Sequence, residues 1–166
     1  MKSSMFRFLF YVPTIIALAS CVSVNIADNE RQRSESVQFS DPSDNFTKVN
    51  HDQLDGLWRN LKNGNSISYL SDCHSPSDPP LKQIHDNIIR DIENRNVLSA
   101  NIVSFNRRRA LRSTVEGSID GVSSKMDILV FKKNNCIYIL NYVALPATYS
   151  ADHMVFESFL KGFSVP

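Results

Sequence analysis

Glycine, tryptophan and clustered charge are all scarce in this sequence. The 166 residues include five glycines and one tryptophan, and the formal net charge at pH 7 is +1. So few glycines provide no glycine-rich loop for a phosphate, and the Gly-x-Ser-x-Gly turn of the α/β-hydrolases is missing as well. The balanced charge argues against a nucleic acid as partner, because phosphate backbones select a clustered basic excess. We therefore expect no cofactor, no nucleic-acid partner and no enzymatic activity.

The N-terminal segment has the three-part layout of a secretory signal. A charged start with Lys2 and Arg7 is followed by an apolar run from Phe8 to Ala19 and then by small residues. The residues that close it, Leu18-Ala19-Ser20-Cys21, resemble the lipobox of bacterial lipoproteins. The resemblance implies that residues 1–20 form a signal peptide, that Cys21 receives lipid, and that the mature chain has 146 residues.

Two other interpretations of this segment remain open. The cysteine can follow an ordinary signal peptide by chance, or the segment can be an uncleaved transmembrane helix. Pro13 and the weakly apolar stretch 20–25 argue against the helix. If Cys21 is acylated, the protein is held in the cell envelope by its lipid. Val22 stands where an aspartate would favour the inner membrane, so we expect an outer-membrane protein that faces the periplasm.

The two remaining cysteines are Cys73 and Cys136. An even pair in an exported chain favours a disulfide, because the compartments outside the cytosol are oxidising. Two buried free thiols are the alternative. A zinc site with His51 or His74 is not expected, because the cysteines lack Cys-x-x-Cys spacing.

The composition divides the mature chain into a tether and one domain. Residues 21–48 are polar, weakly patterned and rich in serine, aspartate and asparagine, which predicts a flexible tether behind the acylated cysteine. Residues 49–166 have a length and an apolar content that suit a single domain.

Two helices are predicted in this domain. A helix over 80–95 begins at Pro79-Pro80 and presents an apolar stripe at Leu81, Ile84, Ile88 and Ile92. A C-terminal helix over 150–162 is capped by Ser150 and has an aromatic stripe that must pack on a broad surface. The segment 51–58 is expected to form one or two helical turns.

About five strands complete the domain. They are predicted at 66–70, 97–105, 110–119, 124–132 and 136–143, where apolar and polar residues alternate or β-branched residues gather. Asp120-Gly121 is a strong signal for a two-residue hairpin turn. The last strands, joined by short turns, predict an antiparallel meander, so the fold class is α+β.

The order of elements and one motif resemble the Mog1/PsbP-like fold. A tyrosine-bearing strand, Ile137 to Tyr142, is followed by a helix with the pattern Phe156…Leu160-x-x-Phe163. The resemblance implies an antiparallel sheet with helices on its faces, in a fold that hosts non-enzymatic binding and assembly proteins. The sequence is also similar to uncharacterised bacterial lipoproteins with Ser-x-Cys and Lys-x-x-Cys-x-Tyr motifs, here Ser71 to Cys73 and Lys133 to Tyr138.

Few residues stand out as a site. The aromatic candidates for the lining of a small-ligand or lipid pocket are Trp58, Phe131, Tyr138, Tyr142 and Tyr149, with core packing as the default for such residues. Arg107-Arg108-Arg109 is interpreted as a solvated turn, with an anion or headgroup patch as the alternative. A metal site from Asp120 and Asp127 is not expected, because Asp120 is explained by its turn.

These observations predict a membrane-anchored lipoprotein of the cell envelope. We expect a non-enzymatic binding or assembly factor, which contacts the membrane through Cys21 and an envelope protein through its domain. A small-ligand or lipid-binding protein is the alternative, and an envelope hydrolase is the weakest of the three hypotheses.

Overall fold

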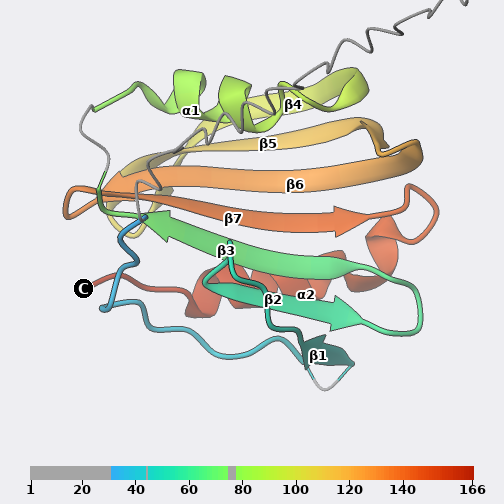
Figure 1. The fold of residues 1–166 in the computed structure, drawn as a ribbon, viewed down its shortest axis with the longest axis horizontal. Helices are drawn as coiled ribbons and strands as arrows, with labels where there is room; N and C mark the ends of the chain where they lie inside the picture. The colour runs from blue at the N-terminus through green and yellow to red at the C-terminus, as the bar shows by residue number, and fades with distance from the viewer. Residues whose placement is uncertain (1–30, 44, 75–77) are drawn as a thin grey trace, which may run out of the picture.

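The computed structural model describes residues 31–43, 45–74 and 78–166. They form one antiparallel sheet of seven strands in the order β1-β2-β3-β7-β6-β5-β4, with two helices (Figure 1). The strands are β1 Phe46–Lys48, β2 Gly56–Asn60, β3 Ser66–Asp72, β4 Glu93–Phe105, β5 Arg108–Ile119, β6 Val122–Lys133 and β7 Cys136–Ala144. The helices are α1 Leu81–Ile88 and α2 Tyr149–Gly162. The predicted α+β class is confirmed, with seven strands in place of about five.

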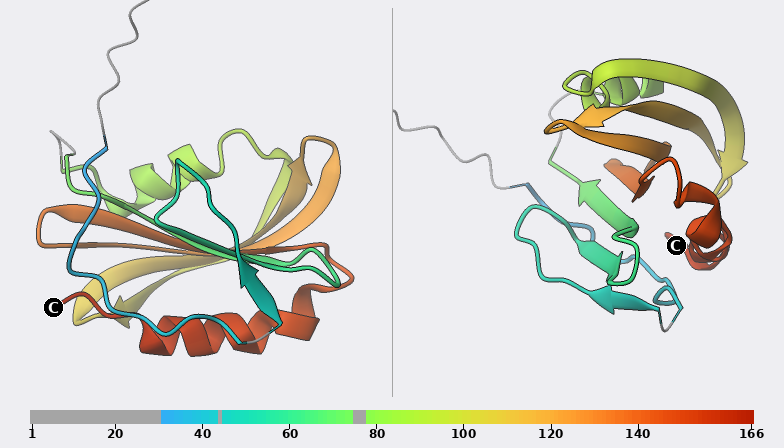
Figure 2. Two further views of the ribbon diagram at one scale, coloured as in Figure 1. Left: turned by 60° about the horizontal axis from the view of Figure 1, so that its bottom comes forward. Right: turned by 90° about the vertical axis from the view of Figure 1, so that its right-hand side faces the viewer.

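The two helices cover opposite faces of the twisted sheet (Figure 2). On the α2 face the core is largely aromatic and includes Trp58, Tyr138 and Phe156. On the α1 face the core is aliphatic and includes Ile84, Val115 and Ile128. The inner strand β6 is therefore buried on both faces, as its apolar run Ile128 to Phe131 requires.

Three tight turns build the predicted meander from β4 to β7. Each turn has two central residues with positive φ: Asn106 and Arg107, Asp120 and Gly121, and Asn134 and Asn135. Positive φ at both positions is typical of type I′ turns, whose twist matches that of the flanking strands. The hairpin predicted at Asp120-Gly121 is confirmed.

The helix predicted over 80–95 is shorter than expected. It ends at Ile88, and β4 begins at Glu93 after a turn. Ile89 and Ile92 are nevertheless buried on the α1 face. The turn after α1 therefore buries the apolar side chains whose spacing predicted a longer helix. Gly117 of β5 makes this possible, because a Cβ there would lie 2.7 Å from the carbonyl oxygen of Glu93 and collide with Ile92.

The ordered domain begins well before the predicted boundary at residue 49. Gln38 pairs with Ser164 through two main-chain hydrogen bonds of 2.8 and 2.7 Å. Phe39 contacts the ring of Trp58, and Phe46 is buried in β1. The expectation of a tether over 21–48 is thus wrong for residues 31–43 and 45–48, because their few apolar side chains pack on the α2 face. Cys21 and the signal segment 1–20 lie outside the described residues.

The segment 51–58 was expected to be helical and is not. It is a loop that leads into β2, where Gly56, Trp58 and Asn60 point into the core with the two-residue period of a strand. A Cβ on Gly56 would lie 2.5 Å from the Trp58 ring, so the glycine makes room for the indole.

Cys73 and Cys136 are joined by a disulfide, which ties the chain after β3 to the start of β7. Across the described ranges, neither helix has the length and apolar character needed to cross a membrane.

Candidate functional site

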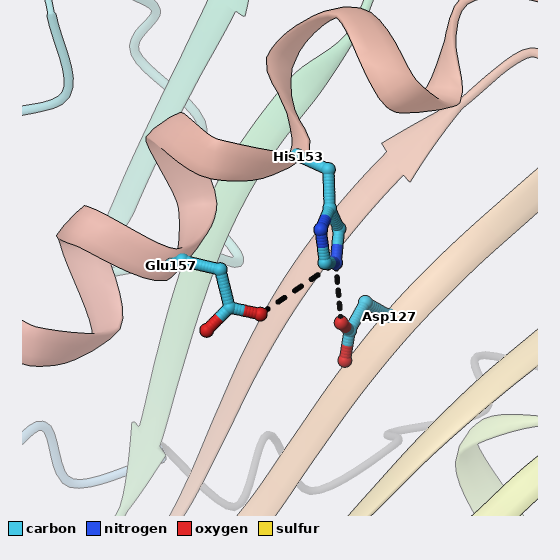
Figure 3. Close-up of side chains that lie close together, drawn as sticks. All are labelled: Asp127, His153 and Glu157. Atoms are coloured by element: carbon cyan, nitrogen blue, oxygen red, sulfur yellow. Dashed lines mark hydrogen bonds and ion pairs between the residues drawn. The ribbon is translucent and has the colours of Figure 1, made fainter.

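A cluster of four charged or titratable side chains lies between the sheet and α2. Arg112 comes from β5, Asp127 from β6, and His153 and Glu157 from successive turns of α2. Figure 3 shows the imidazole of His153 directed at both carboxylates. Arg112 and Asp127 share the face that α2 covers, whereas their neighbours Ser113 and Ile128 lie on the α1 face.

Arg112 bridges the two acids. Its Nε and Nη2 donate to the two oxygens of Asp127 at 3.0 and 2.6 Å. Nη1 donates to Glu157 Oε2 at 3.3 Å, and Nη2 makes a second, shorter bond to Glu157 Oε1. The hydrogen bond to Asp127 is the main cause of a raised pKa of Arg112, so the guanidinium is a permanent cation.

His153 completes the cluster. Its Nε2 lies 2.9 Å from Asp127 Oδ2 and 3.7 Å from Glu157 Oε1. The ring of Tyr149 stacks on the imidazole at 4.9 Å, and Lys125 Nζ lies 4.9 Å from the centre of that tyrosine ring. Burial, followed by the charge of Asp127, raises the pKa of Tyr149 to about 12. The phenol is therefore neutral at physiological pH and acts as a hydrogen-bonding and stacking group.

Asp127, His153 and Glu157 have the donor types and spacing of metal ligands. One ligand atom from each lies within 4.8 Å of the others, and an imidazole with two carboxylates suits a transition metal. Arg112 Nη2 already donates to Asp127 Oδ2 and Glu157 Oε1, two of these atoms. A metal ion would have to compete with this internal cation, so the arrangement serves first as an ion-pair network that fastens α2 to the sheet.

Two adjoining hollows open beside the cluster. One has a volume of about 270 Å³ and is lined by polar residues of β4 and β5 together with Tyr149, His153 and Glu157. The other, of about 480 Å³, is lined by Phe105, Leu129, Leu160, Phe163 and Lys161 among others. Val103, Arg112 and Glu157 line both, so the hollows together form a groove between α2 and β4. We call it the α2–β4 groove.

A second set of side chains has the order of a catalytic triad but not its accessibility. His85 Nε2 lies 2.7 Å from Ser113 Oγ, and His85 Nδ1 lies 3.5 Å from Asp86 Oδ1. Ser113 of β5 is completely buried, and His85, on the buried side of α1, is 4% exposed. A substrate cannot reach this hydroxyl in the described conformation, so the pair satisfies two buried polar groups.

Of the five aromatic residues predicted to line a pocket, the structure places four in the core and one at a hollow. Trp58, Phe131, Tyr138 and Tyr142 are at most 1% exposed and pack in the core of the α2 face. Tyr149 lines the smaller hollow of the α2–β4 groove. Four of the five are thus core residues, as their position on buried faces of strands demands.

The charged cluster was missed by sequence reasoning because its members come from three separate segments. Two local signals point to it. Asp127 interrupts the apolar alternation of a strand that is buried on both faces, and His153 and Glu157 are four residues apart on the final helix. Asp120, considered together with Asp127 in the sequence, lies in the turn after β5.

Comparisons with known proteins identify the fold. No protein-family model matches the sequence. No curated protein matches it either. The structure is similar to the PsbP-like protein CyanoP of Synechocystis sp. PCC 6803, with a TM-score of 0.59 and 14% identity over 90% of this chain and 99% of that chain. It is also similar to LpqN of Mycobacterium tuberculosis, described as involved in cell envelope biogenesis, with a TM-score of 0.58 and 9% identity over 83% of this chain and 88% of that one. At such low identities the likeness shows a fold shared with these two proteins, which is consistent with the PsbP-like resemblance of the sequence.

Proposed function

We propose that the protein is a lipid-anchored factor of the cell envelope with a non-enzymatic binding or assembly role. The N-terminal Leu18-Ala19-Ser20-Cys21 motif supports the anchor, and an outer-membrane position facing the periplasm follows from Val22. The similarity to LpqN, a protein of cell envelope biogenesis, supports the compartment. The disulfide agrees with an oxidising environment.

The observation that carries the binding role is the α2–β4 groove. Its two acids share the guanidinium of Arg112, which donates to both Asp127 and Glu157, so both carboxylates are engaged as hydrogen-bond acceptors. Its walls combine apolar surface from Leu129 and Phe163 with polar groups from Ser99 and Asn101. Mixed walls of this kind are typical of protein-binding surfaces, in which an apolar centre has a polar rim.

The proposal is tested by cross-linking in intact membranes. The acylated protein is cross-linked, purified and compared with an Asn101→Arg variant, which places a long charged side chain in the wall of the smaller hollow, because Asn101 pairs with Arg112 on the face that α2 covers. Ser123→Arg on the exposed start of β6 is the matched control. We expect one envelope protein to be enriched with the native chain and the control and lost with Asn101→Arg. Equal recovery from all three would show that the groove does not bind the partner.

The anchor is tested separately. Mass spectrometry of the mature protein should find an acylated N-terminal cysteine at residue 21 and no protein of this mass after Cys21→Ser. A mature N-terminus at any other residue would refute the lipoprotein proposal.

A small amphiphilic ligand is the second candidate for the groove. The larger hollow has a volume of about 480 Å³, within the range of small-molecule sites. Leu129, Leu160 and Phe163 offer an apolar wall, and Lys161 offers a cation for an acidic head. A fluorescent fatty acid should then bind to the native chain and bind more weakly to Lys161→Gln. Unchanged binding to Lys161→Gln would remove this candidate.

A further inference from the structure

One end of the sheet collects basic side chains, of which three arginines are exposed and two lysines are half-buried. The β4–β5 turn carries Arg107, Arg108 and Arg109, and the end of β6 carries Lys132 and Lys133. The strand register places these two turns at the same end, because Phe105 pairs with Arg108 and Lys133 pairs with Cys136. We call the five residues the basic end.

The charges of the basic end are only partly compensated. Lys132 is paired with the exposed Asp78. Lys133 donates to the carbonyl oxygen of Val165, and the neighbouring Asn134 donates to the carbonyl oxygen of Pro166 at 2.8 Å. Arg107, Arg108 and Arg109 are exposed and, within the ranges that the structure describes, take part in none of the ion pairs. A local positive excess therefore faces solvent here.

The chain that leads to the proposed anchor reaches the domain at this same end. Arg31 donates to the carbonyl oxygen of Ser71 at 2.9 Å and to Asp55 Oδ1 at 2.8 Å. The main-chain N–H of Cys73 donates to the carbonyl oxygen of Gln32 at 2.8 Å. Both views of the ribbon that show the sheet lengthwise place the start of the described chain, the C-terminus and the β6–β7 turn at the same side (Figures 1 and 2).

The length of the connecting chain limits how the domain can stand on the membrane. Ten peptide steps separate Cys21 from Arg31, and they span at most about 35 Å when fully extended. The strands β5 and β6, of 12 residues each, are about 40 Å long. An anchor at Cys21 therefore keeps the basic end closer to the lipid than the opposite end.

We propose that the basic end docks on the anionic phospholipid surface in which Cys21 is anchored. This inference rests on the lipid anchor of the proposed function. Lysine and arginine side chains close to an anionic bilayer are attracted by its surface potential, and a basic patch together with an acyl chain is a common two-part anchor. Docking at this end holds the long axis of the sheet away from the bilayer. The α2–β4 groove lies along that axis, with its larger hollow beside the basic end at Asn106 and its smaller hollow, at Ser99 and Asn101, further from the bilayer and open to a partner.

Energy transfer from the protein to the lipid surface tests the orientation. The acylated full chain is inserted in vesicles that carry an acceptor dye on a small fraction of the headgroups. A donor dye is attached at Pro166→Cys, at the basic end, or at Ser123→Cys, beside the opposite turn. The disulfide and the acylation of Cys21 leave the introduced cysteine as the reactive thiol. We expect stronger transfer from residue 166 than from residue 123 on vesicles rich in phosphatidylglycerol, and a smaller difference on pure phosphatidylcholine or in 1 M salt, where the Debye length is about 3 Å.

Charge removal supplies the matched control. Arg108→Gln/Arg109→Gln should lower the ratio of docked to undocked protein by roughly 30-fold, since each basic residue near the surface contributes about a factor of five. Lys62→Gln/Arg90→Gln removes the same charge elsewhere and should change nothing. Equal transfer from both dyes, or equal effects of the two double variants, would overturn the docking proposal. A chain found without lipid on Cys21 would refute the anchor alone, and its preference for anionic over neutral vesicles would then decide the role of the basic end.

Discussion

Replacement of Arg112 by methionine should destabilise the fold far more than the loss of a surface ion pair. Asp127 is 2% exposed and receives two hydrogen bonds from the guanidinium. Methionine retains most of the apolar stem but leaves this carboxylate buried with His153 as its remaining partner in the cluster. A buried charge that loses its partner costs about 3–5 kcal/mol. We therefore expect the free energy of unfolding to fall by this amount in Arg112→Met.

Two further variants show where that energy comes from. Glu157 is about a quarter exposed, so Glu157→Gln should cost less than about 1 kcal/mol. Asp127→Asn in the Arg112→Met background removes the unpaired charge, so the double variant should be more stable than Arg112→Met alone. The coupling in this double-mutant cycle should exceed about 1 kcal/mol in magnitude, as for residues in one polar network.

The assay is urea unfolding at neutral pH, followed by circular dichroism and by the fluorescence of Trp58, which is buried in the same core. If the free energy of unfolding of Arg112→Met falls by less than about 1 kcal/mol, the reasoning is contradicted, because the Arg112 bridge would then be worth no more than an exposed ion pair. A double variant that is less stable than the single one would contradict it as well.

Two other predictions concern stability. The double variant Cys73→Ser/Cys136→Ser opens a loop with a sequence separation of 63, whose closure the chain-entropy model values at about 4 kcal/mol. The urea midpoint should therefore fall clearly, while the circular dichroism spectrum of the folded protein should change little. Burial and the nearby Asp55 raise the pKa of Tyr69 to about 12, above its ordinary value of 10. The folded state thus holds this proton more tightly than the unfolded chain. Stability should decline as pH rises from about 10 to 12, by on the order of 2–3 kcal/mol for this residue. Tyr69→Phe should flatten the decline, and an unchanged slope would show that Tyr69 does not cause it.

The sequence predicted best those elements whose neighbours along the chain are also their neighbours in space. The strands of the meander and the turn at Asp120-Gly121 are local, and the alternation of β5 and β6 matches the two faces of the sheet. The C-terminal helix begins at Tyr149, one residue before the predicted start, and ends at the predicted residue, Gly162. Its N-cap is Thr148, so the predicted cap Ser150 lies within the helix.

The errors arose where a long-range contact overrides a local pattern. The stripe through Ile88 and Ile92 has helical spacing, but the approach of β4 to Gly117 ends the helix early. The segment before β1 is polar, yet its Phe39 packs against the distant Phe159, and Phe46 at the start of β1 is buried. The charged cluster was invisible for the same reason, since Arg112 and Glu157 are 45 residues apart and meet only when α2 lies on the sheet.

The fastening of residues 31 and 32 beside Cys73 determines how the domain responds to mechanical load. Tension on the chain before residue 31 acts first on the hydrogen bonds that Arg31 and Gln32 make with Ser71 and Cys73, and the disulfide connects Cys73 covalently to β7 in the middle of the sheet. The short edge strand β1 comes later along the same chain, so these contacts must break before tension reaches the edge of the sheet. Residues 31 and 32 thus protect the edge strands from a force applied at the N-terminal side.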